Sequence, residues 1–217
     1  NLVSNAGVVA TDVTGVGTVR QYLAACEYGG DKGIFGYGDT PTKVSVSNLV
    51  SNAGVVATDV TGVGSARNGV AACEYGDDKA IFGYGTTGSV TAVSNLVSNA
   101  GVVATDVTGV GTARRALAAC SYGYDKGIFG YGDSGPMVSM TNLVSNVGVV
   151  ATDVTGVGTD RRYLGACEYA GDKGIFAYGD TGSMVSMSNL VSNAGVVATD
   201  VTGVGSARSG PAACSFN

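Results

Sequence analysis

The chain has 217 residues, a formal net charge of −5, 36 glycines, and no histidine or tryptophan. An apolar content of 45% with only 13% charged residues argues against a disordered chain, which would have few apolar and many charged residues. The negative charge argues against a nucleic-acid partner, because affinity for phosphates depends on Lys and Arg. No apolar run approaches the roughly 20 residues of a membrane-spanning helix, so we expect no membrane partner either.

A repeat of 47 residues organises the whole chain. The segment Asn-Leu-Val-Ser-Asn begins at Asn1, Asn48, Asn95, Asn142 and Asn189, and the last copy of the unit is partial. Internal repeats of this length indicate an architecture in which one supersecondary unit is stacked on the next. We therefore expect residues 1–217 to form a single domain.

One unit is predicted to contain four β-strands, at residues 21–28, 33–37, 43–50 and 55–60. Apolar and β-branched residues fill these segments, whereas Gly, Asn, Asp and Pro occupy the turns between them. Four short strands in a unit of roughly 40 to 50 residues are typical of a β-propeller blade. A helical solenoid is disfavoured by the glycines and the β-branched runs. The predicted fold class is all-β, a β-propeller of four-stranded antiparallel blades.

The unit resembles a kelch repeat. Arg20 precedes a strand that ends in Leu-Ala-Ala-Cys-Glu-Tyr-Gly, followed by Gly-Ile-Phe-Gly-Tyr-Gly and then by Arg67 of the next unit. Kelch units have the same order, although Gly-Tyr-Gly stands here in place of their glycine pair and the aromatic residue that opens their fourth strand is missing. WD-type repeats fit less well, since the chain has no Trp-Asp and no Gly-His. The array also resembles repeats of phage and environmental virion-associated proteins, which implies a virion or an extracellular assembly.

The repeat count predicts four complete blades and a split fifth blade. In that blade a strand near residues 209–216 would join strands near residues 2–13, which pairs the two termini in one sheet. The second strand of the fifth blade is missing. Three explanations are open: the sequence is a fragment of a longer array, which we favour, another chain supplies the strand, or the fifth blade is distorted.

Three polar or sulfur-containing residues recur once in every unit. We expect the cysteines to be small buried residues of the innermost strand rather than metal ligands, because the chain lacks His and close Cys pairs. We expect the Asp before Thr-Gly-Val-Gly to shape a turn or to pair with the Arg of the unit, and Asp31-Lys32 to form a hairpin turn. No metal and no cofactor are predicted. The series are Cys26, Cys73, Cys120, Cys167 and Cys214, then Asp12, Asp59, Asp106, Asp153 and Asp200, then Arg20, Arg67, Arg114, Arg161 and Arg208.

The composition contains few of the residues that enzymes commonly use for catalysis. The absence of His removes the most frequent general base and metal ligand. A hydrolase with paired carboxylates is the least favoured function, because the acidic residues occur as copies in every unit. We therefore expect a protein that is not an enzyme.

The positions at which the units differ are the main functional indication. The two residues after each Arg vary, and so does the stretch after the second strand, at residues 39–43, 86–90, 133–137 and 180–184. Both clusters are expected on one rim of the propeller, where loops on a rigid scaffold carry binding residues. Neutral drift of exposed loops is the alternative explanation. The predicted ligand-binding residues are Gln21, Tyr22, Asn68, Arg115, Arg162 and Tyr163.

Two functions therefore follow from the sequence. The first is a non-enzymatic binding or structural module that engages a glycan or a protein through the variable rim. The second is a self-assembling ring or filament subunit, completed by strands from neighbouring chains through its open termini.

Overall fold

The computed structural model describes residues 1–4 and 6–215, and over these residues the fold is all-β, as predicted. The strands form four antiparallel sheets of three strands each, in chain order. The sheets comprise β1 (Ala24–Tyr28), β2 (Lys32–Gly36) and β3 (Ser47–Val50); β4 (Ala71–Tyr75), β5 (Lys79–Gly83) and β6 (Ser94–Val97); β7 (Ala118–Tyr122), β8 (Lys126–Gly130) and β9 (Thr141–Val144); and β10 (Gly165–Tyr169), β11 (Lys173–Ala177) and β12 (Ser188–Val191).

All four sheets have the same register. In the first sheet β1 pairs with β2 from Ala24↔Gly36 to Tyr28↔Lys32, and β2 pairs with β3 from Gly33↔Val50 to Gly36↔Ser47. The predicted hairpin turn is confirmed by the antiparallel pair Tyr28↔Lys32, which encloses residues 29–31, and Lys32 Nζ lies 2.7 Å from Asp31 Oδ1. The amide of Asn52 donates to the same carboxylate at 2.9 Å. This hydrogen bond ties the turn to the loop that follows the third strand.

The predicted fourth strand, at residues 55–60, is wrong as a regular strand. That segment meets the sheet only at two isolated bridges, Val50↔Val56 and Ser47↔Val60. The physical reason is a side chain between them: Asn48 Nδ2 donates to the carbonyl of Ala57 at 3.1 Å. An amide side chain thus takes a backbone acceptor that a continuous ladder would use.

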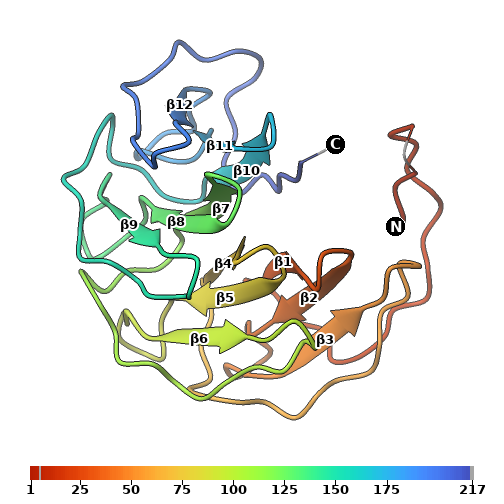
Figure 1. Cartoon of the computed structure of the whole chain (residues 1–217). Helices are drawn as coiled ribbons and strands as arrows, with labels where there is room; N and C mark the ends of the chain where they lie inside the picture. Colours follow the sequence, from red (N-terminus) through yellow and green to blue (C-terminus); the bar gives the residue numbers. More distant parts are fainter. Residues whose placement is uncertain (5, 216–217) are drawn as a thin grey trace.

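The sheets lie side by side along a curved row, with their first strands on the inner side of the curve (Figure 1). Strands β1, β4, β7 and β10 contact one another in this order. At each interface a phenylalanine ring of one sheet packs against a glycine of the sheet before it. A Cβ on Gly36 would lie 2.6 Å from the Cζ atom of Phe82, so no larger residue fits opposite that ring. The same contact joins Phe129 to Gly83 and Phe176 to Gly130.

The sequence starts within one repeat unit and stops within another. At the amino end Val3 bridges Val9, as Val50 bridges Val56. At the carboxyl end the amide of Gly210 donates to the carbonyl of Tyr163, as that of Gly69 donates to Tyr22. Among the described residues, no bridge or hydrogen bond joins residues 1–15 to residues 206–215. The predicted pairing of the two termini in one sheet is therefore absent there, and Figure 1 shows the two ends facing each other across a gap. Phe216 lies outside the described residues.

Candidate functional site

The two variable clusters of the sequence lie next to each other in every unit. Gln21 bridges Asp39, and in the later units Asn68, Arg115 and Arg162 bridge the equivalent residue after the second strand. The second residue of each variable pair is held in the left-handed region, with φ of 53° at Tyr22 and 55° at Tyr163. The structure thus brings together all six residues that the sequence singled out, on a rim built from these loops. We call this surface the variable rim.

A chain of backbone hydrogen bonds runs along the variable rim from unit to unit. Each amide donates to the carbonyl one unit earlier, at 2.8 to 3.0 Å. The bonds are Gly69 to Tyr22, Ala116 to Gly69, Tyr163 to Ala116 and Gly210 to Tyr163. Because these residues are tied through the backbone, their side chains are free to differ while their positions are fixed. A rigid frame with variable side chains is the arrangement expected of a recognition surface.

The variable rim is charged on its later units. Arg162 Nη1 lies 2.8 Å from Asp133 Oδ2, and its Nε lies 3.4 Å from Asp180 Oδ2. Arg115 is exposed and lies 3.8 Å from Asp133. On the first unit the rim instead presents Tyr22, which is 56% exposed. The rim therefore offers an aromatic face at one end and a cluster of guanidinium and carboxylate groups at the other.

A second group of residues was missed by the sequence analysis. Glu27, Glu74 and Glu168 occupy equivalent positions on the innermost strands β1, β4 and β10, and Ser121 takes this position on β7. All four line a cavity of about 1390 Å³ that opens between the inner strands and the gap at the termini. The available signal was the position directly after each cysteine, where one unit has Ser and the other three complete units have Glu.

The glutamates of this cavity repel one another. Burial raises the pKa of Glu74 to about 7, and the carboxylates of Glu27 and Glu168 contribute to the shift. The pKa values of Glu27 and Glu168 are also raised, again mainly by burial. Among the residues that the structure describes, no group of three or more potential ligands is placed to hold a metal ion.

The Arg and Asp series form the framework under the variable rim. The predicted Arg–Asp pairing is confirmed: Arg67 Nη1 lies 3.9 Å from Asp106 Oδ1, and three further units have distances of 3.7 to 3.9 Å. Asp106 has closer partners in Ser65, whose hydroxyl donates to Oδ2 at 2.6 Å, and in Asn95, whose amide donates at 2.9 Å. Arg67 donates to the carbonyl of Tyr84 at 2.8 Å and to Asn95 Oδ1 at 2.6 Å. This network is structural, because it satisfies a fully buried guanidinium.

Each buried Arg also stacks on a tyrosine of the preceding unit. The guanidinium carbon of Arg67 lies 4.1 Å from the centre of the Tyr37 ring. The edge of the same ring packs against Phe82, with the ring centres 5.2 Å apart. Tyr37 adopts φ of 63°, a conformation that costs a non-glycine residue energy. The tyrosine of Gly-Tyr-Gly is thus held between an Arg and a Phe of the next unit.

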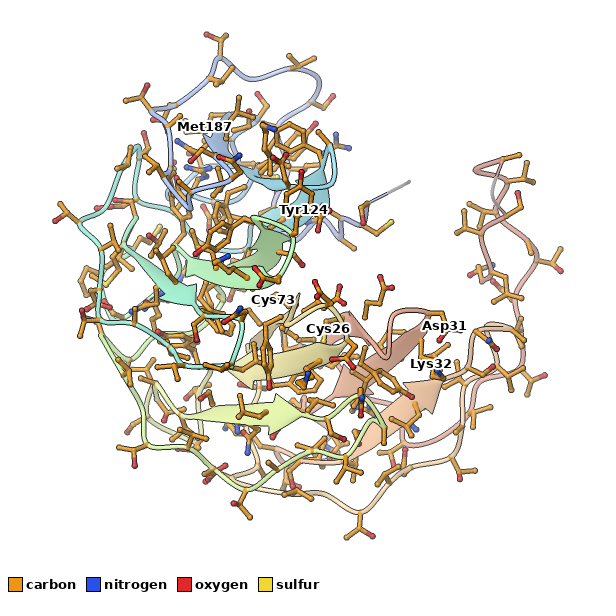
Figure 2. The ribbon with its side chains drawn as sticks, in the orientation of Figure 1. Cys26, Asp31, Lys32, Cys73, Tyr124 and Met187 are labelled. Atoms are coloured by element: carbon orange, nitrogen blue, oxygen red, sulfur yellow. The ribbon has the colours of Figure 1, made fainter. Side chains whose placement is uncertain are left out.

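The cysteines follow the prediction only in part. Cys73 and Cys120 are buried, whereas Cys26 and Cys167 are half-buried and Cys214 is exposed. A Cβ on Gly127 would lie 2.6 Å from Cys73 Sγ, so this thiol packs into the next sheet. Cys26 and Cys73 stand on the first strands of neighbouring sheets (Figure 2). Burial raises the pKa of Cys73 far above its usual value, which disfavours the reactive thiolate.

No protein-family model and no curated protein matches the chain. The resemblance to kelch repeats therefore remains a prediction. Over the described residues, no helix is long and apolar enough to cross a membrane.

Proposed function

We propose that the chain is a β-propeller that acts as a non-enzymatic binding module through its variable rim. The four sheets would be four blades, and the segments at the two ends would contribute to a fifth. The curved row of sheets with β1, β4, β7 and β10 on its inner side supports this arrangement (Figure 1). The repeated hydrogen bond from each unit to the one before it supports it as well.

One observation carries the proposed function. The two variable clusters, after the Arg and after the second strand, lie next to each other in each complete unit, whereas the residues that hold the units together, such as Arg67, Asn95 and Phe82, recur in the same contacts. Tyr22, Arg115 and Arg162 give this rim a planar aromatic surface and forked donors. These groups are enriched where proteins recognise other molecules. The ligand would be a glycan or a protein surface, with the aromatic face and the arginines as its contacts.

The test compares the wild-type chain with a variant in which Tyr22, Arg115, Arg162 and Tyr163 are changed to Ala. Both proteins are applied to a glycan array and used as bait for a protein pull-down. The expected result is a wild-type ligand that the variant loses. Equal binding by the two proteins would exclude the variable rim as the site.

A matched control separates binding from folding. Val102 and Val149 are more than half exposed and lie away from the variable rim, on the segments that follow the third strands. Changing both to Ala should leave binding intact. Circular dichroism of all three proteins checks that the rim variant has kept its sheets.

The second candidate function, a self-assembling ring or filament subunit, meets an obstacle in Ala177. This residue stands at the position that Gly36, Gly83 and Gly130 occupy in the other sheets, where a Cβ would meet a phenylalanine ring at 2.6 to 2.7 Å. A phenylalanine from another chain that took the place Phe82 has beside Gly36 would meet the Cβ of Ala177. Light scattering tests this point: a wild-type monomer that associates after Ala177→Gly identifies Ala177 as the block, whereas a wild-type filament would favour self-assembly.

A further inference from the structure

On the variable rim, an ion pair joins the fourth unit to the third. Arg162 Nη1 lies 2.8 Å from Oδ2 of Asp133 in the unit before it, and its Nε lies 3.4 Å from Asp180 in its own unit. The Asp133 side chain is only 8% exposed, and its Oδ1 accepts the amide of Gly135 at 3.0 Å. A guanidinium of one unit and a carboxylate of the preceding unit thus hold each other in place.

The interface between the second and third units lacks this carboxylate. The residues 47 positions before Arg162 and Asp133 are Arg115 and Thr86. Thr86 has the same local geometry as Asp133, because its side-chain oxygen also accepts the amide two residues further on, at 3.3 Å. Threonine has no second oxygen, however. Nothing at this interface therefore corresponds to the Oδ2 atom that pairs with Arg162.

Arg115 consequently keeps its hydrogen-bond donors unused. Its side chain is 47% exposed, and it lies 3.8 Å from Asp133, which is too far for a hydrogen bond. That carboxylate is already engaged by Arg162. Among the described residues, the guanidinium of Arg115 has no hydrogen-bond partner. A planar fork of N–H donors in this condition matches an external carboxylate.

The neighbours of Arg115 are neutral polar groups and an aromatic ring. The amide of Thr86 donates to the carbonyl of Asn68 at 2.9 Å, so these two residues are adjacent. A Cβ on Gly69 would lie 3.4 Å from the Cβ of Arg115, so the stem of Arg115 borders this glycine. The amide of Gly69 donates in turn to the carbonyl of Tyr22, whose side chain is exposed. No side chain of residue 69 separates the tyrosine from the arginine.

This combination of groups fits an acidic sugar better than an acidic peptide. Acidic peptide segments are recognised by clusters of arginines, whereas only one guanidinium is unengaged on this rim. The amide of Asn68 and the hydroxyl of Thr86 can bond to the hydroxyl groups of a sugar. The ring of Tyr22 offers a flat apolar surface to the C–H face of a sugar ring.

We propose that the variable rim binds the carboxylate of an acidic sugar at Arg115, between the second and third units. The sugar carboxylate takes the place relative to Arg115 that the Asp133 carboxylate has relative to Arg162. Asn68 and Thr86 bond to its hydroxyl groups, and Tyr22 packs against the same or the adjoining sugar. This inference rests on the proposed function, and it names the class of glycan and the residue that selects it.

The experiment uses oligosaccharides of hyaluronan, alginate and polygalacturonate, each before and after chemical reduction of its carboxylates to alcohols. Calorimetry measures their binding to the wild-type chain. The expected result is that at least one acidic oligosaccharide binds, and that its reduced form binds at least about tenfold more weakly, because a charge-assisted pair is lost. This comparison leaves the protein unchanged, so a folding defect cannot explain its outcome.

The variant Thr86→Asp locates the site. The new carboxylate would pair with Arg115 as Asp133 pairs with Arg162, and Asp is the residue that three other units carry at this position, so the fold should be kept. Binding of the acidic oligosaccharide should fall at least about tenfold, because the guanidinium is then occupied from within the chain. Val102→Asp is the matched control: it adds the same charge at an exposed position away from the rim and should leave binding unchanged.

The proposal is overturned if no acidic oligosaccharide binds, if the reduced forms bind equally well, or if Thr86→Asp binds as the wild type does. Binding of polyglutamate through Arg115 in place of the sugars would also overturn it, in favour of an acidic protein segment. The proposed function fails separately. A neutral glycan or a protein that the rim variant no longer binds would uphold that function, while the lack of any dependence on carboxylates would overturn this inference.

Discussion

The guanidinium carbon of Arg114 lies 4.3 Å from the centre of the Tyr84 ring, and the two residues belong to neighbouring units. The guanidinium also donates to the carbonyl of Tyr131 and to Asn142 Oδ1, within its own unit. One buried side chain therefore fixes the sheet of its own unit and the position of the sheet before it. The same contact recurs between successive units, so it holds each sheet in the same position relative to the one before it.

The first prediction concerns this arginine. Arg114→Met keeps an unbranched stem but removes the donors to Tyr131 and Asn142, which leaves two buried acceptors without partners. The expected loss of unfolding free energy is about 3–5 kcal/mol, the range found when one partner of a buried charged network is removed. Denaturant unfolding measures it.

Arg20→Met is the matched control for that variant. Arg20 has no stacked ring, and its Nε already lacks a partner, so its replacement should cost less, about 1–2 kcal/mol. Equal losses at the two positions would contradict the role given to the stacked tyrosine.

The second prediction concerns the glycine opposite each phenylalanine. In Gly83→Ala the new Cβ would lie 2.6 Å from the Cζ atom of Phe129, and that rigid ring is fully buried. Overpacking of this kind costs about 1–3 kcal/mol, which denaturant unfolding would detect. Gly15→Ala is the control, because a Cβ there has no atom within 4 Å. A Gly83→Ala protein as stable as the Gly15→Ala protein would show that neighbouring sheets can move apart at little cost.

The third prediction concerns the pH dependence of stability. The pKa of Glu74 is raised from 4.5 to about 7, so between these values the folded chain holds a proton that the unfolded chain has lost. Stability should therefore fall as pH rises from about 4.5 to 7, and Glu74→Gln should flatten this limb. Since Glu74 is partly exposed, the effect is about 1 kcal/mol after solvent screening. Thermal melts across this range measure it.

The residue on β7 offers the opposite test. Ser121→Glu would place a further carboxylate in the cavity that Glu74 and Glu168 already line. The decline of stability towards pH 7 should become steeper, because like charges in one cavity disfavour ionisation. A Ser121→Glu protein with an unchanged pH profile would mean that these side chains do not interact.

The fourth prediction concerns the thiols. Cys214 is exposed, and Cys73 and Cys120 are buried with their pKa values raised by burial. A thiol reagent at pH 8 should modify Cys214 first and should leave Cys73 and Cys120 unmodified until the chain unfolds. Peptide mass spectrometry after timed quenching gives the order. Rapid modification of Cys73 in the native protein would contradict the packing of this thiol against Gly127.

Much of the local structure could be predicted from the sequence. The first two strands of each unit were placed to within a few residues, because small and β-branched residues alternate there with Gly, Asp and Asn turns. Local composition could not show that the predicted fourth strand, at residues 55–60, forms only isolated bridges. Its valines have the composition of a strand, and only the structure shows that Asn48 takes the carbonyl of Ala57. A side-chain hydrogen bond across nine positions leaves no mark in local composition.

Of the two candidate sites, one could be predicted from the sequence and the other could not. The variable rim was visible in the sequence, because identical units make each difference conspicuous. The glutamates of the cavity could not be recognised in the sequence. A residue that recurs in most units looks the same there whether its role is structural or functional. The pKa values of these glutamates are raised mainly by burial and in part by carboxylates of different sheets that share one cavity, and sequence separation predicts neither effect.

By itself, the sequence determined the repeat, the all-β class and the residues in which the units differ. These follow from period and composition, which act over a few residues at a time. Only the tertiary structure decided how each unit meets the next. Gly36 leaves room for the ring of Phe82, Ala177 stands at the equivalent position of the fourth sheet, and Arg67 stacks on Tyr37 of the unit before it. Such contacts join residues some 47 positions apart, so their energy depends on the packing of whole sheets rather than on any local preference.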